Sequence, residues 1–138
     1  EIALRPKPLP NVGRMLAFKI GGKAALPPPA EIVPPVLDPP PATASAATVA
    51  KGERVYQTYC SACHGDAAVS GGILPDLRFS STLGDEHWFN IVLSGSLATS
   101  GMVSFSKELT REDADAARAF VIFRANESKK QSSAPKSK

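Results

Sequence analysis

The five residues Cys60-Ser61-Ala62-Cys63-His64 constrain this chain of 138 residues more than any other feature. The pattern C-x-x-C-H is the attachment signature of a c-type haem. Two cysteines three positions apart on a helical turn can bond the two vinyl groups on one edge of a porphyrin, and the adjacent histidine then reaches the iron. No other cysteine is present, so none remains for a disulfide framework. The motif predicts one covalent haem, anchored by Cys60 and Cys63 and ligated by His64.

Two other kinds of site could use the cysteine pair. A thiol-redox pair needs no histidine at position 64, and it usually follows a strand, a pattern that residues 50–59 do not show. A structural zinc site needs four ligands, and His87 has no second cysteine pair near it. Haem is therefore the favoured interpretation, with zinc and thiol chemistry as the alternatives.

The iron needs a second axial donor, and the chain offers Met15, Met102 and His87. Met102 is favoured because it lies in the loop-like residues 100–105, where Gly101 lets the backbone approach a flat ring. His87 is interpreted as a polar surface residue near the start of a helix, and Met15 lies outside the haem region. We therefore predict that His64 and Met102 are the two metal ligands.

Apolar residues at helical spacing predict three helices around this motif. The first is capped by Thr48 and ends at the first cysteine, and the second covers residues 85–94. The third begins at Thr110, with Asp113 at the capping-box position.

Residues 50–127 resemble a class I cytochrome c, and more narrowly the cytochrome domain of quinohaemoprotein alcohol dehydrogenases. The resemblance implies an all-α fold, a small class I cytochrome c fold of three to five helices around a covalent haem, preceded by an extended arm and a proline-rich linker. Val103 stands where many class I cytochromes have proline after the ligating methionine. The matching segments are Lys51-Gly52, Val55-Tyr56, 60–65, 70–78, 91–95 and Gly101-Met102.

The same resemblance implies roles for four further residues. The first and last helices of the fold cross, and Gly52 is expected to face Phe120 there. Pro75 is expected to accept a hydrogen bond from the ring nitrogen of His64, which would orient that ligand. Arg78 is expected near a haem propionate, since a planar bidentate donor suits a carboxylate.

The chain divides into four segments by composition. Residues 1–26 form an arm in which Leu16, Phe18 and Ile20 alternate with other residues as in a strand, and the arm resembles the last strand of a β-propeller. Residues 27–48 form a Pro/Ala-rich linker, with eight prolines between positions 27 and 41. Such a density favours a polyproline II spacer, with a proline-rich recognition ligand as the alternative. Residues 49–127 form the cytochrome domain and residues 128–138 a disordered basic tail.

Charge and hydropathy limit the partners. Residues 1–49, 50–127 and 128–138 carry net charges of +2, −3 and +4, so the basic character of the chain comes from its ends. This distribution does not predict a nucleic-acid surface. No apolar run is long enough to cross a bilayer. Haem attachment occurs outside the bacterial cytoplasmic membrane, so the expected compartment is the periplasm.

These observations predict a one-electron relay that is not an enzyme on its own, because both axial positions of the iron are filled. The resemblance implies a separate dehydrogenase domain with pyrroloquinoline quinone (PQQ) as the electron donor, and a soluble copper protein, a cytochrome or an oxidase as the acceptor. PQQ itself would lie only in that separate domain. A stand-alone periplasmic carrier is one alternative, and a haem peroxidase, which requires Met102 off the iron, is another.

Overall fold

Helices make up the regular secondary structure of the described residues, and no strand occurs among them. The structure is a computed structural model that describes residues 15, 17–25, 28 and 36–133. The predicted all-α fold is therefore confirmed. The elements are α1 (Ala46–Tyr59), α2 (Ser61–His64), η2 (Asp66–Ala68), η3 (Leu77–Phe79), η4 (Ser81–Gly84), α3 (His87–Val92), η5 (Ala98–Ser100) and α4 (Arg111–Ser133).

Helix α1 begins earlier than the sequence predicts. The side chain of Ser45, not that of Thr48, caps the helix, because the Ser45 hydroxyl accepts a hydrogen bond of 3.1 Å from the backbone N–H of Thr48. Thr48 thus lies in the first turn. The other end agrees with the prediction, since α1 stops at Tyr59 and Cys60 is its C-cap.

Helix α4 begins at the predicted capping box and ends beyond the predicted boundary. The N–H of Asp113 donates to the Thr110 hydroxyl at 3.2 Å, and the N–H of Thr110 donates to the Asp113 carboxylate at 3.1 Å. The helix continues to Ser133, so a disordered tail from residue 128 is wrong for residues 128–133. Ser128 is buried, which explains why the helix does not stop there. Residues 134–138 lie outside the described residues.

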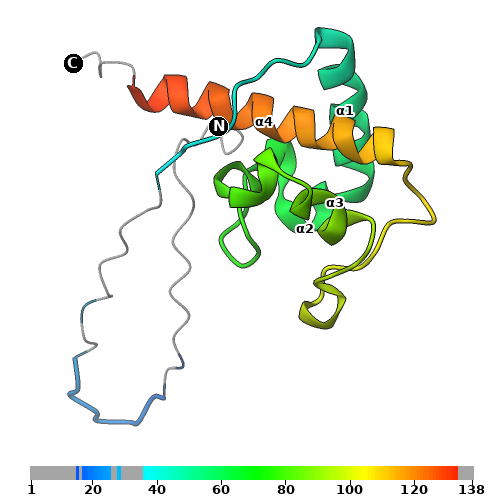
Figure 1. The fold of residues 1–138 in the computed structure, drawn as a ribbon. Helices are drawn as coiled ribbons and strands as arrows, with labels where there is room; N and C mark the ends of the chain where they lie inside the picture. Colours follow the sequence, from blue (N-terminus) through cyan, green and yellow to red (C-terminus); the bar gives the residue numbers. More distant parts are fainter. Residues whose placement is uncertain (1–14, 16, 26–27, 29–35, 134–138) are drawn as a thin grey trace.

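Helices α1 and α4 cross closely, and Figure 1 shows α4 lying across α1. The crossing occurs at Gly52, which faces both Ala116 and Phe120 of α4. The tightest approach is to the Ala116 backbone, so the missing side chain makes room for a main chain as well as for Phe120. One turn later, the rings of Tyr56 and Phe120 pack with centroids 5.3 Å apart.

Helix α3 is shorter than the predicted range of 85–94, and it is fastened to α4 by Trp88. The indole Nε1 of Trp88 donates to the carbonyl oxygen of Ala114 at 2.9 Å, in a buried position. Next to it, the Arg111 guanidinium lies 3.8 Å from the centroid of the Phe89 ring. These contacts fix α3 against α4.

The end of the predicted linker packs against the domain, and the predicted boundary at residue 48 is wrong because α1 begins at Ala46. We call residues 36–44 the strap. Leu37 of the strap is buried, and the Asn126 side-chain amide donates to the Pro40 carbonyl at 2.8 Å. Lys129 forms an ion pair of 3.0 Å with Asp38. Residues 27 and 29–35 of the linker lie outside the described residues.

The N-terminal arm does not form the predicted strand in its described part. Residues 17–19 carry no regular structure, a turn follows at 20–21, and Leu16 lies outside the described residues. The side chains of Phe18 and Ile20 are exposed, and this part of the chain lies apart from the helices in Figure 1. A strand needs a partner for its hydrogen bonds, and the described residues provide none.

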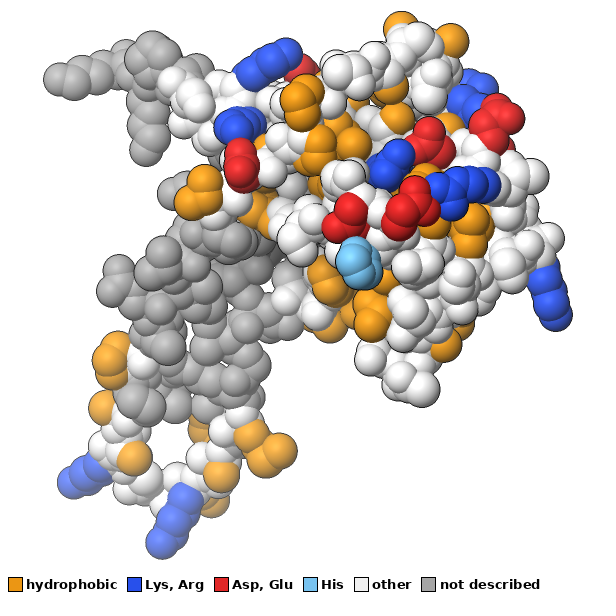
Figure 2. Space-filling model, viewed as in Figure 1, with side chains coloured by type: hydrophobic (Ala, Val, Ile, Leu, Met, Phe, Trp, Pro, Cys, Tyr) orange, Lys and Arg blue, Asp and Glu red, His pale blue; other side chains and the backbone are white. Residues whose placement is uncertain are grey.

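The surface carries both signs of charge. On the face drawn in Figure 2, acidic and basic side chains lie close together. Ion pairs such as Arg111–Glu86, at 2.6 Å, occur among the described residues. This face has no patch of one sign such as a nucleic-acid surface requires. In the part of the chain that the structure describes, no helix has the length and apolar character needed to span a membrane.

Candidate functional site

A cavity of about 740 Å³ brings the predicted anchors and both predicted ligands together. Its volume lies in the range of small-molecule and cofactor sites, and apolar side chains form much of its wall. The cavity is lined by Cys60, Cys63, His64, Ser70, Gly72, Leu74, Pro75, Asp76, Leu77, Phe79, Ser80, Ser81, Thr82, Trp88, Ile91, Val92, Leu97, Ser100, Gly101 and Met102.

The cysteine motif lies on one helical turn where α1 passes into α2. The carbonyl oxygen of Cys60 accepts hydrogen bonds from the N–H of Cys63 at 3.2 Å and of His64 at 2.9 Å. Cys60 is buried and Cys63 is exposed. Burial, followed by the nearby Cys63, raises the pKa of the Cys60 thiol to about 11. A redox-active thiol needs a lowered pKa, so this environment does not suit the thiol-redox alternative.

His64 is oriented by a single carbonyl group. Its Nδ1 lies 2.9 Å from the Pro75 oxygen, which can only accept, so Nδ1 carries the proton and donates. This leaves Nε2 as the nitrogen with a lone pair for a metal. His64 is buried and lines the cavity. The structure thus places the Pro75 carbonyl group beside the ring of His64, in the contact that the resemblance implies.

Tyr56 supports the same turn and was not identified from the sequence. Its hydroxyl donates to the carbonyl oxygen of Gly65 at 2.9 Å, immediately after His64. Burial raises the pKa of Tyr56, so the phenol stays protonated and remains a donor. The apolar spacing of α1 marks Tyr56 as a core residue, but no local pattern shows that its hydroxyl reaches Gly65.

Met102 reaches the cavity from a loop held by several hydrogen bonds. Its N–H donates to the Leu97 carbonyl at 3.2 Å, and Gly101 before it has a φ of 96°, which glycine adopts without strain. The Ser104 hydroxyl donates to the Leu93 carbonyl at the end of α3. The Phe105 N–H donates to the Val92 carbonyl at 2.9 Å. These bonds hold the loop around Val103, the position at which many class I cytochromes have a proline.

The other two candidate ligands lie elsewhere. The imidazole of His87 is exposed and lies 3.2 Å from the Asp85 carboxylate, away from the cavity lining. Met15 is fully exposed in the arm. The described residues contain no cluster of three or more His, Cys, Asp or Glu side chains that could hold a metal ion. The described residues therefore give no support to the zinc alternative.

Arg78 does not line the cavity, although its neighbours Leu77 and Phe79 do. Its guanidinium is buried, forms an ion pair of 2.7 Å with Asp76, and donates to the Ser128 hydroxyl at 2.9 Å. The propionate contact of Arg78 stays a prediction. Two of its partners, Asp76 and Ser128, come from the cavity wall and from α4.

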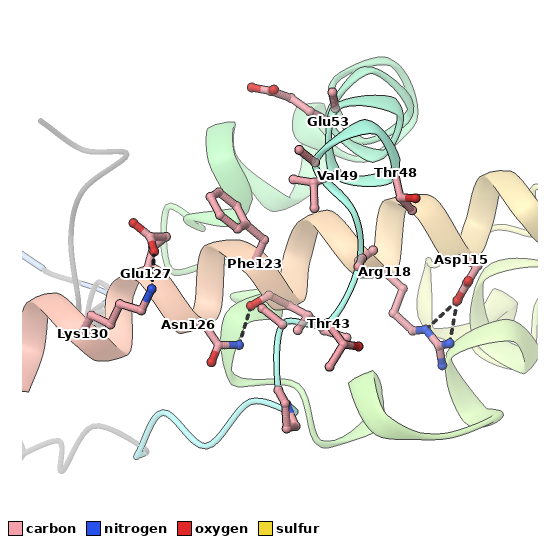
Figure 3. A pocket seen from close by; sticks show the side chains of 17 residues that line it. Thr43, Thr48, Val49, Glu53, Asp115, Arg118, Phe123, Asn126, Glu127 and Lys130 are labelled. Carbon is pink, nitrogen blue, oxygen red and sulfur yellow. Dashed lines mark hydrogen bonds and ion pairs between the residues drawn. The ribbon is translucent and has the colours of Figure 1, made fainter.

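A second hollow of about 770 Å³ lies between the strap, α1 and α4. Figure 3 shows Val49 and Phe123 on its apolar side, with Glu53, Glu127 and Lys130 around it. No cysteine, histidine or methionine lines this hollow. This hollow therefore lacks the cysteine, histidine and methionine side chains that the predicted haem site needs.

Comparison with known families agrees with the site geometry. A family model described as cytochrome c oxidase, cbb3-type, subunit III matches residues 47–121, which is more than half of the chain. The chain belongs to this family of cytochrome c domains. The matched range begins at the start of α1 and ends within α4, and so it contains the whole cavity lining.

The relatives of this chain are much longer proteins, and the similarity covers only a part of each. The chain is 44% identical over 119 residues to the dehydrogenase subunit of alcohol dehydrogenase (quinone) from Gluconobacter oxydans, covering 86% of this chain and 16% of the relative. It is 42% identical over 118 residues to quinohemoprotein alcohol dehydrogenase ADH IIB from Pseudomonas putida, covering 85% and 17%. The chain thus spans about one sixth of these relatives.

A solved structure shows the same relationship. Quinohemoprotein alcohol dehydrogenase ADHIIG from Pseudomonas putida HK5 superposes with a TM-score of 0.63 at 37% identity, covering 79% of this chain and 16% of that one. The 119 residues aligned with the first relative are more than the chain holds from position 27 onward, so the similarity extends through the linker into the arm. The chain carries a cytochrome c domain, and it has the electron-transfer role of that family.

The residues present fit a c-type haem. Both cysteines, one imidazole nitrogen and one thioether sulfur lie on the lining of a single cavity, and the rest of its wall is largely apolar. Thioether and imidazole are suitable axial donors for haem iron.

Proposed function

We propose that this cytochrome c domain binds one haem, held by thioether bonds to Cys60 and Cys63 and ligated by His64 and Met102, and that it relays single electrons. The observation that carries the proposal is the shared cavity of these four side chains. When bound, the haem supplies a ferric/ferrous couple whose potential histidine and methionine ligation raises.

The protein's own residues position the two donors. The Pro75 carbonyl holds the His64 ring through Nδ1 and increases its basicity as a ligand. The loop bonds of Leu97 and Ser104 hold Met102 at the wall. With both axial positions filled, the domain has no coordination site for substrate, so it would not oxidise alcohol by itself.

The names of the relatives support a place in a dehydrogenase. Alcohol dehydrogenases (quinone) and quinohemoprotein alcohol dehydrogenases contain the matching segment. We therefore assign a PQQ dehydrogenase domain as the electron donor and a periplasmic copper protein, cytochrome or oxidase as the acceptor. The arm that precedes the linker would then pair with the donor's β-propeller.

Absorption spectroscopy of the protein matured in a host that attaches c-type haem tests the ligand set. The purified protein should keep its haem on a denaturing gel, and the oxidised form should show the near-infrared methionine-to-iron charge-transfer band. Met102→Ala should abolish that band while the haem stays attached. Met15→Ala is the matched control and should leave it unchanged, since Met15 is fully exposed.

Two outcomes would contradict the proposal. A colourless protein whose intact mass matches the polypeptide alone would show that no haem is attached. A charge-transfer band that survives in Met102→Ala would show that Met102 is not the second ligand. The size of the native polypeptide that carries this sequence distinguishes a dehydrogenase domain from a stand-alone carrier. We expect a polypeptide several times longer than this chain, as in the relatives.

A further inference from the structure

We propose that Arg78 is a positioning residue for His64, acting with Asp76 and Ser128 as a buried clasp that fixes the carbonyl group of Pro75. These three residues are called the clasp below. The inference rests on the proposed ligation by His64. It gives Arg78 a role different from the propionate contact that the sequence suggests.

The two charged groups of the clasp meet side by side. Nε of Arg78 donates to Oδ1 of Asp76 at 2.9 Å, and Nη2 donates to Oδ2 at 2.7 Å. Their side chains are 0% and 5% exposed, so the pair is nearly dry. Such a two-bond contact between planar groups sets their relative orientation as well as their distance.

The clasp reaches His64 through one peptide group. The Pro75 oxygen that accepts from His64 belongs to the peptide bond joining Pro75 to Asp76. A peptide unit is planar, so the position of Asp76 determines where that oxygen lies. Asp76 is held twice, because its carboxylate also accepts from the Arg78 backbone N–H at 3.2 Å and caps η3.

Ser128 attaches this arrangement to a rigid element. Nη1 of Arg78 donates to the Ser128 hydroxyl at 2.9 Å in a fully buried contact between residues 50 positions apart. Ser128 lies within the long helix α4, which also packs across α1. The loop that carries Pro75 is thereby tied to the main helical crossing of the domain.

A buried ion pair adds little net stability compared with apolar side chains of the same volume. Its use here is geometric, because it places an acceptor at a fixed distance from an axial ligand. Loss of a supporting hydrogen bond to a metal ligand typically costs about 10–100-fold in metal affinity or activity. Removal of the clasp should therefore loosen the hydrogen bond at Nδ1 of His64 before it unfolds the domain.

Exchange of the His64 Nδ1 proton with water, followed by NMR in the ¹⁵N-labelled reduced holoprotein well below its melting temperature, tests the clasp. Ser128→Ala should speed this exchange about fivefold, the factor that corresponds to the average net contribution of one hydrogen bond. Arg78→Lys keeps the charge but loses the planar fork, and it should speed exchange about tenfold or more. Ser132→Ala is the matched control, because Ser132 is an exposed serine of the same helix, and it should change nothing.

Unchanged exchange in Ser128→Ala and Arg78→Lys would overturn the clasp, even if both variants melt earlier. A midpoint potential that gains a pH dependence in Arg78→Lys but not in Ser128→Ala would also overturn it, since the guanidinium would then serve a haem propionate. Failure of the proposed function is distinguishable, because the wild-type protein would already lack a His64 signal shifted by the haem. The milder variant, Ser128→Ala, keeps the test valid if Arg78→Lys does not fold.

Discussion

Gly52 of α1 lies against the backbone of Ala116 in α4, and a Cβ atom built on Gly52 would lie 1.9 Å from the Ala116 carbonyl oxygen. A backbone atom cannot rotate away as the end of a side chain can. Gly52→Ala should therefore force the two helices apart and lower the free energy of unfolding by about 3 kcal/mol, the upper end of ordinary overpacking. Thermal or denaturant unfolding of the holoprotein measures the change.

Gly84→Ala is the control for this substitution. A Cβ at Gly84 would lie 3.5 Å from Cγ of Pro40, an ordinary van der Waals contact. We expect a change within about 0.5 kcal/mol, or a small gain from the reduced entropy of the unfolded chain. Equal destabilisation by the two variants would show that the α1–α4 contact is not the limiting feature.

The loop of Met102 depends on Ser104, whose hydroxyl donates to the Leu93 carbonyl. Ser104→Ala should destabilise this loop by about 1 kcal/mol, the usual contribution of one hydrogen bond. The methionine-to-iron band should then disappear at a lower temperature than in the wild type, while the haem remains attached. Ser96→Ala alters an exposed serine in the preceding part of the chain, and it should leave the temperature profile in place.

The parts of the site that follow from neighbouring residues could be predicted from the sequence. The cysteine motif has a fixed spacing because the porphyrin edge fixes it, and the Thr110–Asp113 box needs only two side chains three positions apart. The cap of α1 was misassigned to Thr48 because Ser45 and Thr48 are both good capping residues, and local sequence does not decide between them.

The long-range contacts could not be predicted in this way. Arg78 and Ser128 are 50 positions apart, and Asn126 bonds a carbonyl 86 positions earlier. No periodicity encodes such pairs, because they depend on how α4 lies over the loops and the strap. For the same reason, residues 128–133 have the composition of a polar tail, yet they continue α4 beyond the buried Ser128.

The strap contributes to the stability of the domain through Leu37, whose residue exposure is only 7%. Leu37→Ala should lower the free energy of unfolding by about 2 kcal/mol, the lower end for a buried leucine. Val36→Ala is the matched control, since Val36 is 86% exposed, and it should change the value by less than about 0.5 kcal/mol. Equal melting temperatures for Leu37→Ala and wild type would mean that the strap does not remain packed in solution.

The capping box of α4 should make stability depend on pH in the acid range. Hydrogen bonds from the Thr110 side chain, followed by Lys51, lower the pKa of Asp113 from 3.8 to about 2. Because the folded-state pKa lies below the unfolded one, the stabilisation is complete above 3.8 and is lost as the pH falls toward 2. Asp113→Ala should therefore lower the melting temperature near neutral pH, and its difference from wild type should shrink across that interval.

A control variant separates the effect of the Thr110–Asp113 cap on stability from the effect of the ion pair with Lys51. Glu112 also contacts Lys51, at 2.7 Å, but the Thr110 bonds are made to Asp113. Glu112→Gln should have little effect on the melting temperature at any pH, because exposed ion pairs contribute little. If the gap between Asp113→Ala and wild type keeps the same size from neutral pH down to pH 2, the cap does not supply the pH dependence, and α4 must be anchored at its start by other contacts.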